Sequence, residues 1–108
     1  MRHDLAAITD RIQELLARIE RGDYPDQARL ENTLTDGYAC ALSLDAECDR
    51  IERRISEHAA GLGADSSVDQ ARELSVLARS LVHRRRELEA LRGVLAVLRA
   101  GAHQARVA

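Results

Sequence analysis

The sequence predicts an all-α protein: a long antiparallel helical hairpin with a shorter N-terminal helix packed on it, in a three-helix, coiled-coil-like bundle. Three observations predict this fold. Apolar residues recur at alternating spacings of three and four through most of the 108-residue chain. The chain has no Trp or Phe and only two Tyr, which suits helix contacts better than a sheet. One proline and six glycines leave few turns, so the helices must be long.

The first helix is predicted over about residues 4–21. Its apolar residues follow an unbroken heptad pattern: Leu5, Ile8, Ile12, Leu15 and Ile19. Gly22 stands where a helix commonly ends, and Pro25 suits the first turn of the next helix. These two residues therefore mark the boundary between the first and the second predicted helix.

The second helix is predicted over about residues 25–60. Its apolar positions run from Leu30 to Ile55 and become regular after Gly37. Residues 32–37 are poor in helix formers, so a kink or a break there is the alternative to the continuous helix that we expect.

The third helix is predicted over about residues 67–100. Leucines repeat at spacings of three and four from Leu74 to Leu98, and Ser67 with Gln70 has the pattern of a capping box. We expect residues 101–108 to be a frayed tail and residues 1–108 to form one helical domain.

Two long helices joined by a short turn must lie antiparallel, which places position n opposite roughly 129 − n. Asp45 then lies level with Arg84 and Arg85, and Arg84 stands in an otherwise apolar pattern. A polar residue in such a pattern is known to specify helix register, so we expect these residues to form salt bridges across the hairpin. Binding of nucleic acid through residues 84–86 is the less favoured interpretation.

The charge composition also argues against nucleic-acid binding. All sixteen basic residues are Arg, against eighteen acids, which gives a net charge of −2.

The longest purely apolar run covers residues 94–98, so no membrane segment is expected. Cys40 and Cys48 lie roughly 12 Å apart if they share one helix, too far for a disulfide, and we expect reduced core thiols of a cytoplasmic protein.

No catalytic, cofactor or metal site is predicted. Ser80 and His83 share a helix face, but no carboxylate that would orient them can be named. Neither His58 nor His83 stands in a Glu-x-x-His or His-x-x-x-His spacing. The chain is therefore expected not to be an enzyme.

The first helix is about half as long as the others, so it leaves residues 45–82 as a two-helix layer. Apolar residues there are expected to contact another helix. These interaction candidates are Ile51, Ile55, Leu74, Val76, Leu77, Leu81 and Val82. We expect a homodimer through this layer and an unidentified protein partner.

A cluster of small residues around Tyr38 is the second candidate site. Gly37, Cys40 and Gly93 are expected to permit a close helix approach, with a groove for a ligand or partner helix as the alternative. The leading hypothesis is thus an interaction or scaffold protein, and the alternative is a regulatory domain that binds an effector near Tyr38.

Overall fold

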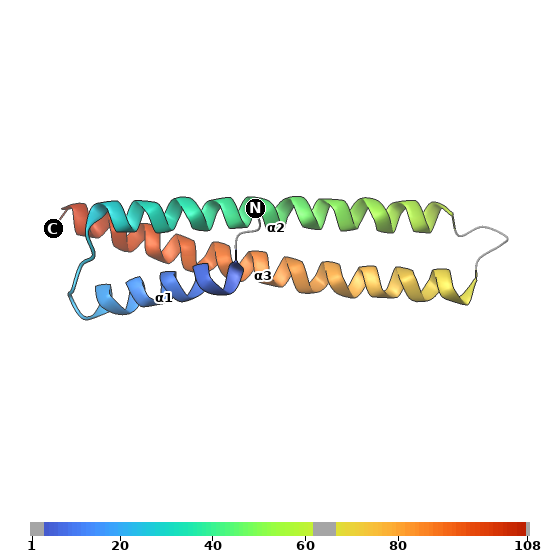
Figure 1. Ribbon diagram of the computed structural model, residues 1–108, viewed down its shortest axis with the longest axis horizontal. Helices are drawn as coiled ribbons and strands as arrows, with labels where there is room; N and C mark the ends of the chain where they lie inside the picture. The colour runs from blue at the N-terminus through green and yellow to red at the C-terminus, as the bar shows by residue number, and fades with distance from the viewer. Residues whose placement is uncertain (1–3, 62–66, 108) are drawn as a thin grey trace. The chain divides into compact units, whose positions relative to one another are not determined.

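The computed structural model describes residues 4–61 and 67–107, with side chains to residue 104. It contains three helices in chain order, α1 (Leu5–Glu20), α2 (Gln27–Ala60) and α3 (Val68–Val107) (Figure 1). The two long helices pack together most and α1 packs on them, so the predicted all-α three-helix bundle is confirmed. No helix in the described ranges combines the length and the apolar character that crossing a membrane requires.

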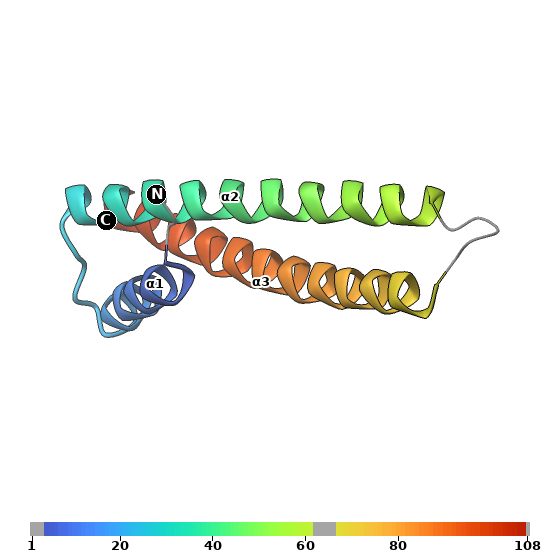
Figure 2. The same ribbon diagram turned by 45° about the vertical axis from the view of Figure 1, so that its right-hand side comes forward.

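The chain divides into two compact units. Unit 1 comprises residues 1–43 and 89–108, and unit 2 comprises residues 44–88. In unit 1, α1 lies beside the first part of α2 and the last part of α3 (Figures 1 and 2). In unit 2, the remaining parts of α2 and α3 run antiparallel to each other.

Helix α1 is held at both ends by local hydrogen bonds. The Asp4 side chain accepts from the backbone N–H groups of Ala6 and Ala7 at 3.0 and 3.4 Å, as an N-cap does. At the other end Gly22 adopts φ +78°, a conformation that favours glycine, and its N–H donates to the Ile19 carbonyl. The predicted end of the first helix is confirmed to within one residue.

Helix α2 begins two residues later than predicted because Asp26 caps it. The Asp26 carboxylate accepts from the backbone N–H of Arg29 at 2.8 Å, and Pro25 precedes the helix. The helix is continuous through residues 32–37, so the expected alternative of a break is excluded.

Helix α3 begins with the predicted capping box. Gln70 N–H donates to Ser67 Oγ at 3.1 Å, and Ser67 N–H donates to Gln70 Oε1 at 3.4 Å. The predicted end at about residue 100 is wrong, since the helix continues to Val107. Ala102 is buried, and a Cβ on Gly101 would lie 3.2 Å from Ile19 Cδ1, so contact with α1 supports these last turns.

The antiparallel register is close to the predicted one. Contacts between α2 and α3 join His58 to Glu73 and Glu47 to Arg84 in unit 2, and Gly37 meets Leu95 in unit 1. Position n therefore lies opposite roughly 131 − n in both units, two residues from the expected rule.

Candidate interaction surfaces

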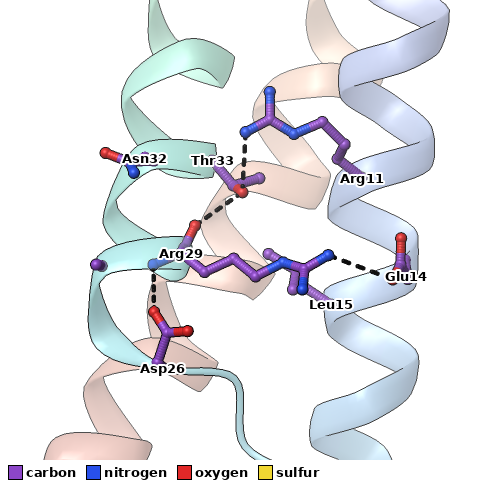
Figure 3. A pocket seen from close by; sticks show the side chains of 8 residues that line it. Arg11, Glu14, Leu15, Asp26, Arg29, Asn32 and Thr33 are labelled. Atoms are coloured by element: carbon purple, nitrogen blue, oxygen red, sulfur yellow. Dashed lines mark hydrogen bonds and ion pairs between the residues drawn. The ribbon is translucent and has the colours of Figure 1, made fainter.

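A polar hollow of about 310 Å³ lies between α1 and the first turns of α2 in unit 1 (Figure 3). Its polar lining includes Arg11, Glu14, Arg29 and Thr33. Thr33 is 2% exposed, and its hydroxyl accepts from Arg11 Nη2 at 3.3 Å and donates to the Arg29 carbonyl at 2.9 Å. Every one of these four side chains thus has a partner within the hollow.

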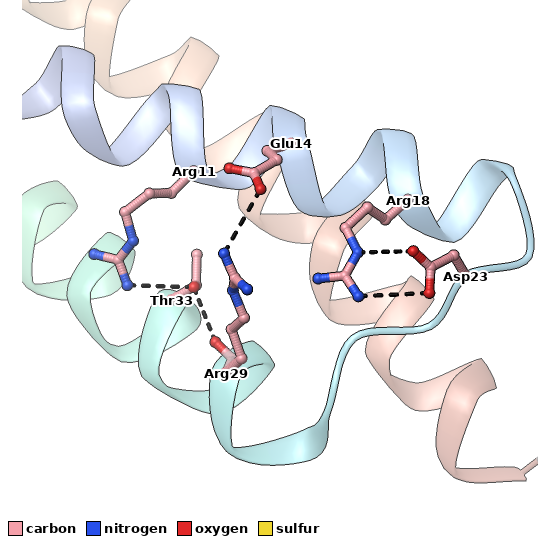
Figure 4. Close-up of polar contacts among 6 residues, drawn as sticks. All are labelled: Arg11, Glu14, Arg18, Asp23, Arg29 and Thr33. Atoms are coloured by element: carbon pink, nitrogen blue, oxygen red, sulfur yellow. Dashed lines mark hydrogen bonds and ion pairs between the residues drawn. The ribbon is translucent and has the colours of Figure 1, made fainter.

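These contacts join α1 to α2 (Figure 4). Arg11 Nη1 lies 2.9 Å from Asp36 Oδ2, and Arg29 Nη2 lies 3.6 Å from Glu14 Oε1. The two arginines of the hollow are paired with acids of the same chain, so its chemistry is that of a polar clamp. This clamp has no signature in the sequence, because a threonine in a stretch poor in helix-forming residues gives no signal of a long-range contact.

The turn after α1 carries a second ion pair. Arg18 Nε lies 3.1 Å from Asp23 Oδ2, and a further bond joins Arg18 Nη2 to Asp23 Oδ1 at 3.5 Å (Figure 4). The hydrogen bond from Arg18, with its positive charge, lowers the pKa of the Asp23 carboxyl and raises the pKa of Arg18. The pair closes the turn between α1 and α2.

The predicted close approach occurs at Gly37 but not at Gly93. Gly37 is buried, and a Cβ built on it would overlap Leu95 Cδ2. Gly93 is exposed, with no neighbouring atom within 4 Å of an added Cβ, so its predicted role is wrong. The register explains the difference, because the residue opposite Gly37 is Leu95.

Tyr38 lines a shallow groove of about 460 Å³ in unit 1. The tyrosine side chain is 41% exposed, and the groove's other lining residues all come from α3: Arg92, Ala96, Arg99, Ala100 and His103. Cys40 is buried and does not line it. A hollow therefore exists at Tyr38, one of the predicted groove residues, and the α3 side of this hollow carries arginines.

Most of the predicted interaction residues form the core of unit 2. Ile51, Leu77 and Leu81 are buried in one cluster with Cys48, and Ile55 packs against it. Leu74 is half-buried. Only Val76 and Val82, exposed by 57% and 48%, remain available to another molecule.

The arginine run of residues 84–86 is largely used in ion pairs. Arg84 Nε lies 3.1 Å from Glu47 Oε1, Arg84 Nη1 lies 2.9 Å from Glu87 Oε1, and Arg85 contacts Glu52. The glutamate that faces Arg84 is thus two residues beyond the predicted Asp45, as the shift in register requires. Two of the three arginines considered for nucleic-acid binding, Arg84 and Arg85, are thus paired with glutamates of the opposite helix.

Both thiols are in helix interfaces. Cys40 and Cys48 are buried and neither is in a disulfide, as predicted. Burial raises the pKa of the Cys48 thiol, which makes the thiolate scarce at neutral pH. Neither residue has the environment of a reactive cysteine.

No group of three or more His, Cys, Asp or Glu side chains that could hold a metal ion occurs in the described residues. Comparisons of the chain with protein-family models, with curated proteins and with solved structures found no match. The function must therefore be argued from these surfaces alone.

Proposed function

We propose that this chain is a non-enzymatic helical interaction protein that self-associates through unit 2 and binds a protein partner in the cytoplasm. The observation that carries the proposal is the exposed apolar surface of unit 2. Val68, Val76 and Val82 of α3 are exposed by 70%, 57% and 48%, outside a core of only a few side chains. A two-helix layer buries one stripe of each helix, and an added helical layer would remove these valines from water.

A cytoplasmic location agrees with the two thiols that are not in a disulfide. The interaction reading is also favoured by the polar contacts described above. The arginines of the polar hollow and of residues 84–85 pair with acids of the same chain, which leaves them no evident role in catalysis.

The test of self-association is the absolute mass in solution, measured by light scattering over a concentration series. We expect a mass twice the 12.0 kDa of one chain. Val76→Gln with Val82→Gln should return the mass to that of one chain, because two polar amides would be buried at the interface. Glutamine has at least the helix propensity of valine, so the helix itself is not weakened.

The matched control is Val97→Gln, an equally exposed valine (58%) of α3 that belongs to unit 1. This variant should keep the mass of the dimer. A wild-type chain that stays monomeric at every concentration would refute self-association and leave a different protein as the occupant of unit 2.

The second candidate function is effector binding at the Tyr38 groove. It is favoured by the 460 Å³ hollow and by its combination of one aromatic ring with Arg92, Arg99 and His103. Such a lining suits a small anion with an apolar part. A screen of acidic aromatic fragments by NMR should shift the resonances of Tyr38 and Ala96, and a screen without such shifts contradicts this function.

A further inference from the structure

One side of α3 in unit 2 carries two interleaved heptad series. Arg72, Arg79 and Arg86 are seven residues apart, and so are Val68, Ser75 and Val82. Seven residues are nearly two helical turns and rise roughly 10.5 Å, so all six side chains share one narrow stripe. We call this stripe the outer face of α3, because Leu77 and Leu81 bury the opposite side of the helix.

The arginines of the outer face differ from their neighbours in charge pairing. All three are exposed, and none forms an ion pair with a residue that the structure describes. Arg84 and Arg85, on the sides of α3 that approach α2, are paired with glutamates. Arg79 has no acid three or four positions away on its own helix, where a local pair would form.

The outer face also has an apolar component. Val68 and Val82 are exposed by 70% and 48%, and Val76 flanks the stripe. A shallow hollow of about 490 Å³ is lined by Val68, Arg72, Val76 and Arg79. Apolar and cationic groups thus alternate along one surface.

We propose that the outer face of α3 docks an acidic amphipathic helix of another protein, one with carboxylates seven residues apart. This inference names the protein partner of the proposed function and rests on it; that partner and a second copy of the chain would compete for the exposed valines. Carboxylates at that spacing would meet the three arginines in turn, in the planar geometry that guanidinium groups favour. Apolar residues between the carboxylates would cover the valines, as in helix-in-groove recognition.

The arginines also disfavour one arrangement of a second copy, and the charge balance of unit 2 disfavours nucleic acid. A second copy of α3 packed antiparallel with the two Arg79 side chains level would set Arg79 against Arg79 and Arg72 against Arg86, which is repulsive, so self-association must bring the two copies together in a different arrangement. Nucleic acid requires a basic surface, but unit 2 contains eight Arg against nine acids. An acidic amphipathic helix would both pair its carboxylates with the arginines and cover the exposed valines.

The test uses the chain itself as the probe. In the full-length variant Arg72→Glu/Arg79→Glu/Arg86→Glu, the outer face becomes an acidic heptad stripe. Packed antiparallel on the wild-type chain, its three new carboxylates would meet the three wild-type arginines. We expect the mixture to form a one-to-one complex at about 20 mM salt and to lose it at about 0.5 M, since salt screens exposed pairs.

The complex is detected as 15N–1H NMR shifts at the outer face of the labelled wild-type chain. Omitting one of the three substitutions should weaken binding roughly two- to fivefold, the contribution of one exposed ion pair. The matched control is Arg50→Glu/Arg53→Glu/Arg54→Glu, which changes three exposed arginines of α2 in the same unit. It should not bind.

Absence of shifts at the outer face, or equal binding by the control variant, overturns the proposal. Binding of a labelled DNA duplex that the triple Glu variant loses, without a mixed complex, overturns it in favour of nucleic acid. Circular dichroism of each variant verifies its helix content. Light scattering of each protein alone tests self-association separately, so failure of that function and failure of this inference are distinguishable.

Discussion

Gly37 and Gly93 lie inside helices but have opposite surroundings. An added methyl group at Gly37 overlaps Leu95, which is 1% exposed and would have to shift within a packed core. At Gly93 the same group enters open space. Gly37→Ala should therefore lower the free energy of unfolding by about 1–2 kcal/mol despite the better helix propensity of alanine. Gly93→Ala should raise it by about 0.5–1 kcal/mol.

Urea unfolding followed by circular dichroism measures both changes. The two variants add the same atoms to the same type of backbone, so each controls for the other. Stabilisation by both substitutions would mean that Leu95 repacks without loss and that the contact at Gly37 is not close.

Single-residue roles were the hardest to predict from the sequence. The spacing of Cys40 and Cys48 along one helix predicted reduced core thiols, and both are buried and outside any disulfide. The predicted role of Gly93 is wrong, because the predicted register placed Gly93 opposite Gly37. The actual register differs by two residues, so Leu95 lies opposite Gly37 instead. The apolar periodicity indicates which side of a helix is buried. Which residue of the facing helix lies opposite a given position depends on the length of the turn that joins the two helices.

The connection between α1 and α2 gives a prediction at the scale of the element. The pKa of Asp23 is lowered below its ordinary value of 3.8, first by its hydrogen bond with Arg18 and then by the charge of Arg18. A carboxyl whose folded pKa is depressed stabilises the fold above its unfolded pKa. That contribution is lost as the pH falls below 3.8 and through the folded pKa.

An NMR titration of the Asp23 carboxyl measures this pKa directly. Arg18→Gln should raise it toward 3.8, whereas Arg21→Gln should change it less, because Arg21 acts on Asp23 only through charge and is the weakest contributor. An unchanged pKa in Arg18→Gln would show that the ion pair does not persist in solution.

The sequence predicted the helices better than their ends. The capping box of Ser67 and Gln70 is a local pattern, so it could be read directly and is confirmed. The extension of α3 past residue 100 depends on the packing of Gly101 against Ile19, eighty-two positions away in the chain. No local pattern reports such a contact.

Burial differs between the two units of the molecule. Among the residues that the structure describes, the large side chains that are less than 2% exposed all lie in unit 1: Ile12, Leu15, Leu30, Leu91, Leu95, Leu98 and Thr33. The core of unit 2 retains 4% to 9% exposure. Local opening exposes less apolar surface in unit 2, so it should require less free energy there.

Native-state hydrogen exchange tests this difference. Backbone amides of residues 48–58 and 74–84 should exchange faster, by roughly tenfold or more, than those of residues 30–40 and 91–98. Ligand or partner binding to unit 2 should slow exchange in the first set. Equal protection throughout would mean that the chain opens as one cooperative unit, in agreement with the single domain that the sequence predicts.

The fold class could be predicted because apolar residues recur at alternating spacings of three and four residues through all three helices. The interaction surface could be predicted only in part. Ile51, Leu77 and Leu81 were assigned to a partner although α2 and α3 bury them against each other. The heptad series of Arg72, Arg79 and Arg86 is visible in the sequence, but its significance depends on the absence of ion pairs with described residues, which only the structure reveals.

The eight-residue separation of the two cysteines has a practical consequence. Cys40 belongs to unit 1 and Cys48 to unit 2, and each is shielded by the helix packing of its own unit. A thiol reagent can therefore reach either sulfur only when that unit opens. The natural chain thus carries one intrinsic chemical probe per unit, and mass spectrometry of the labelled peptides could time the two openings in the unmodified protein.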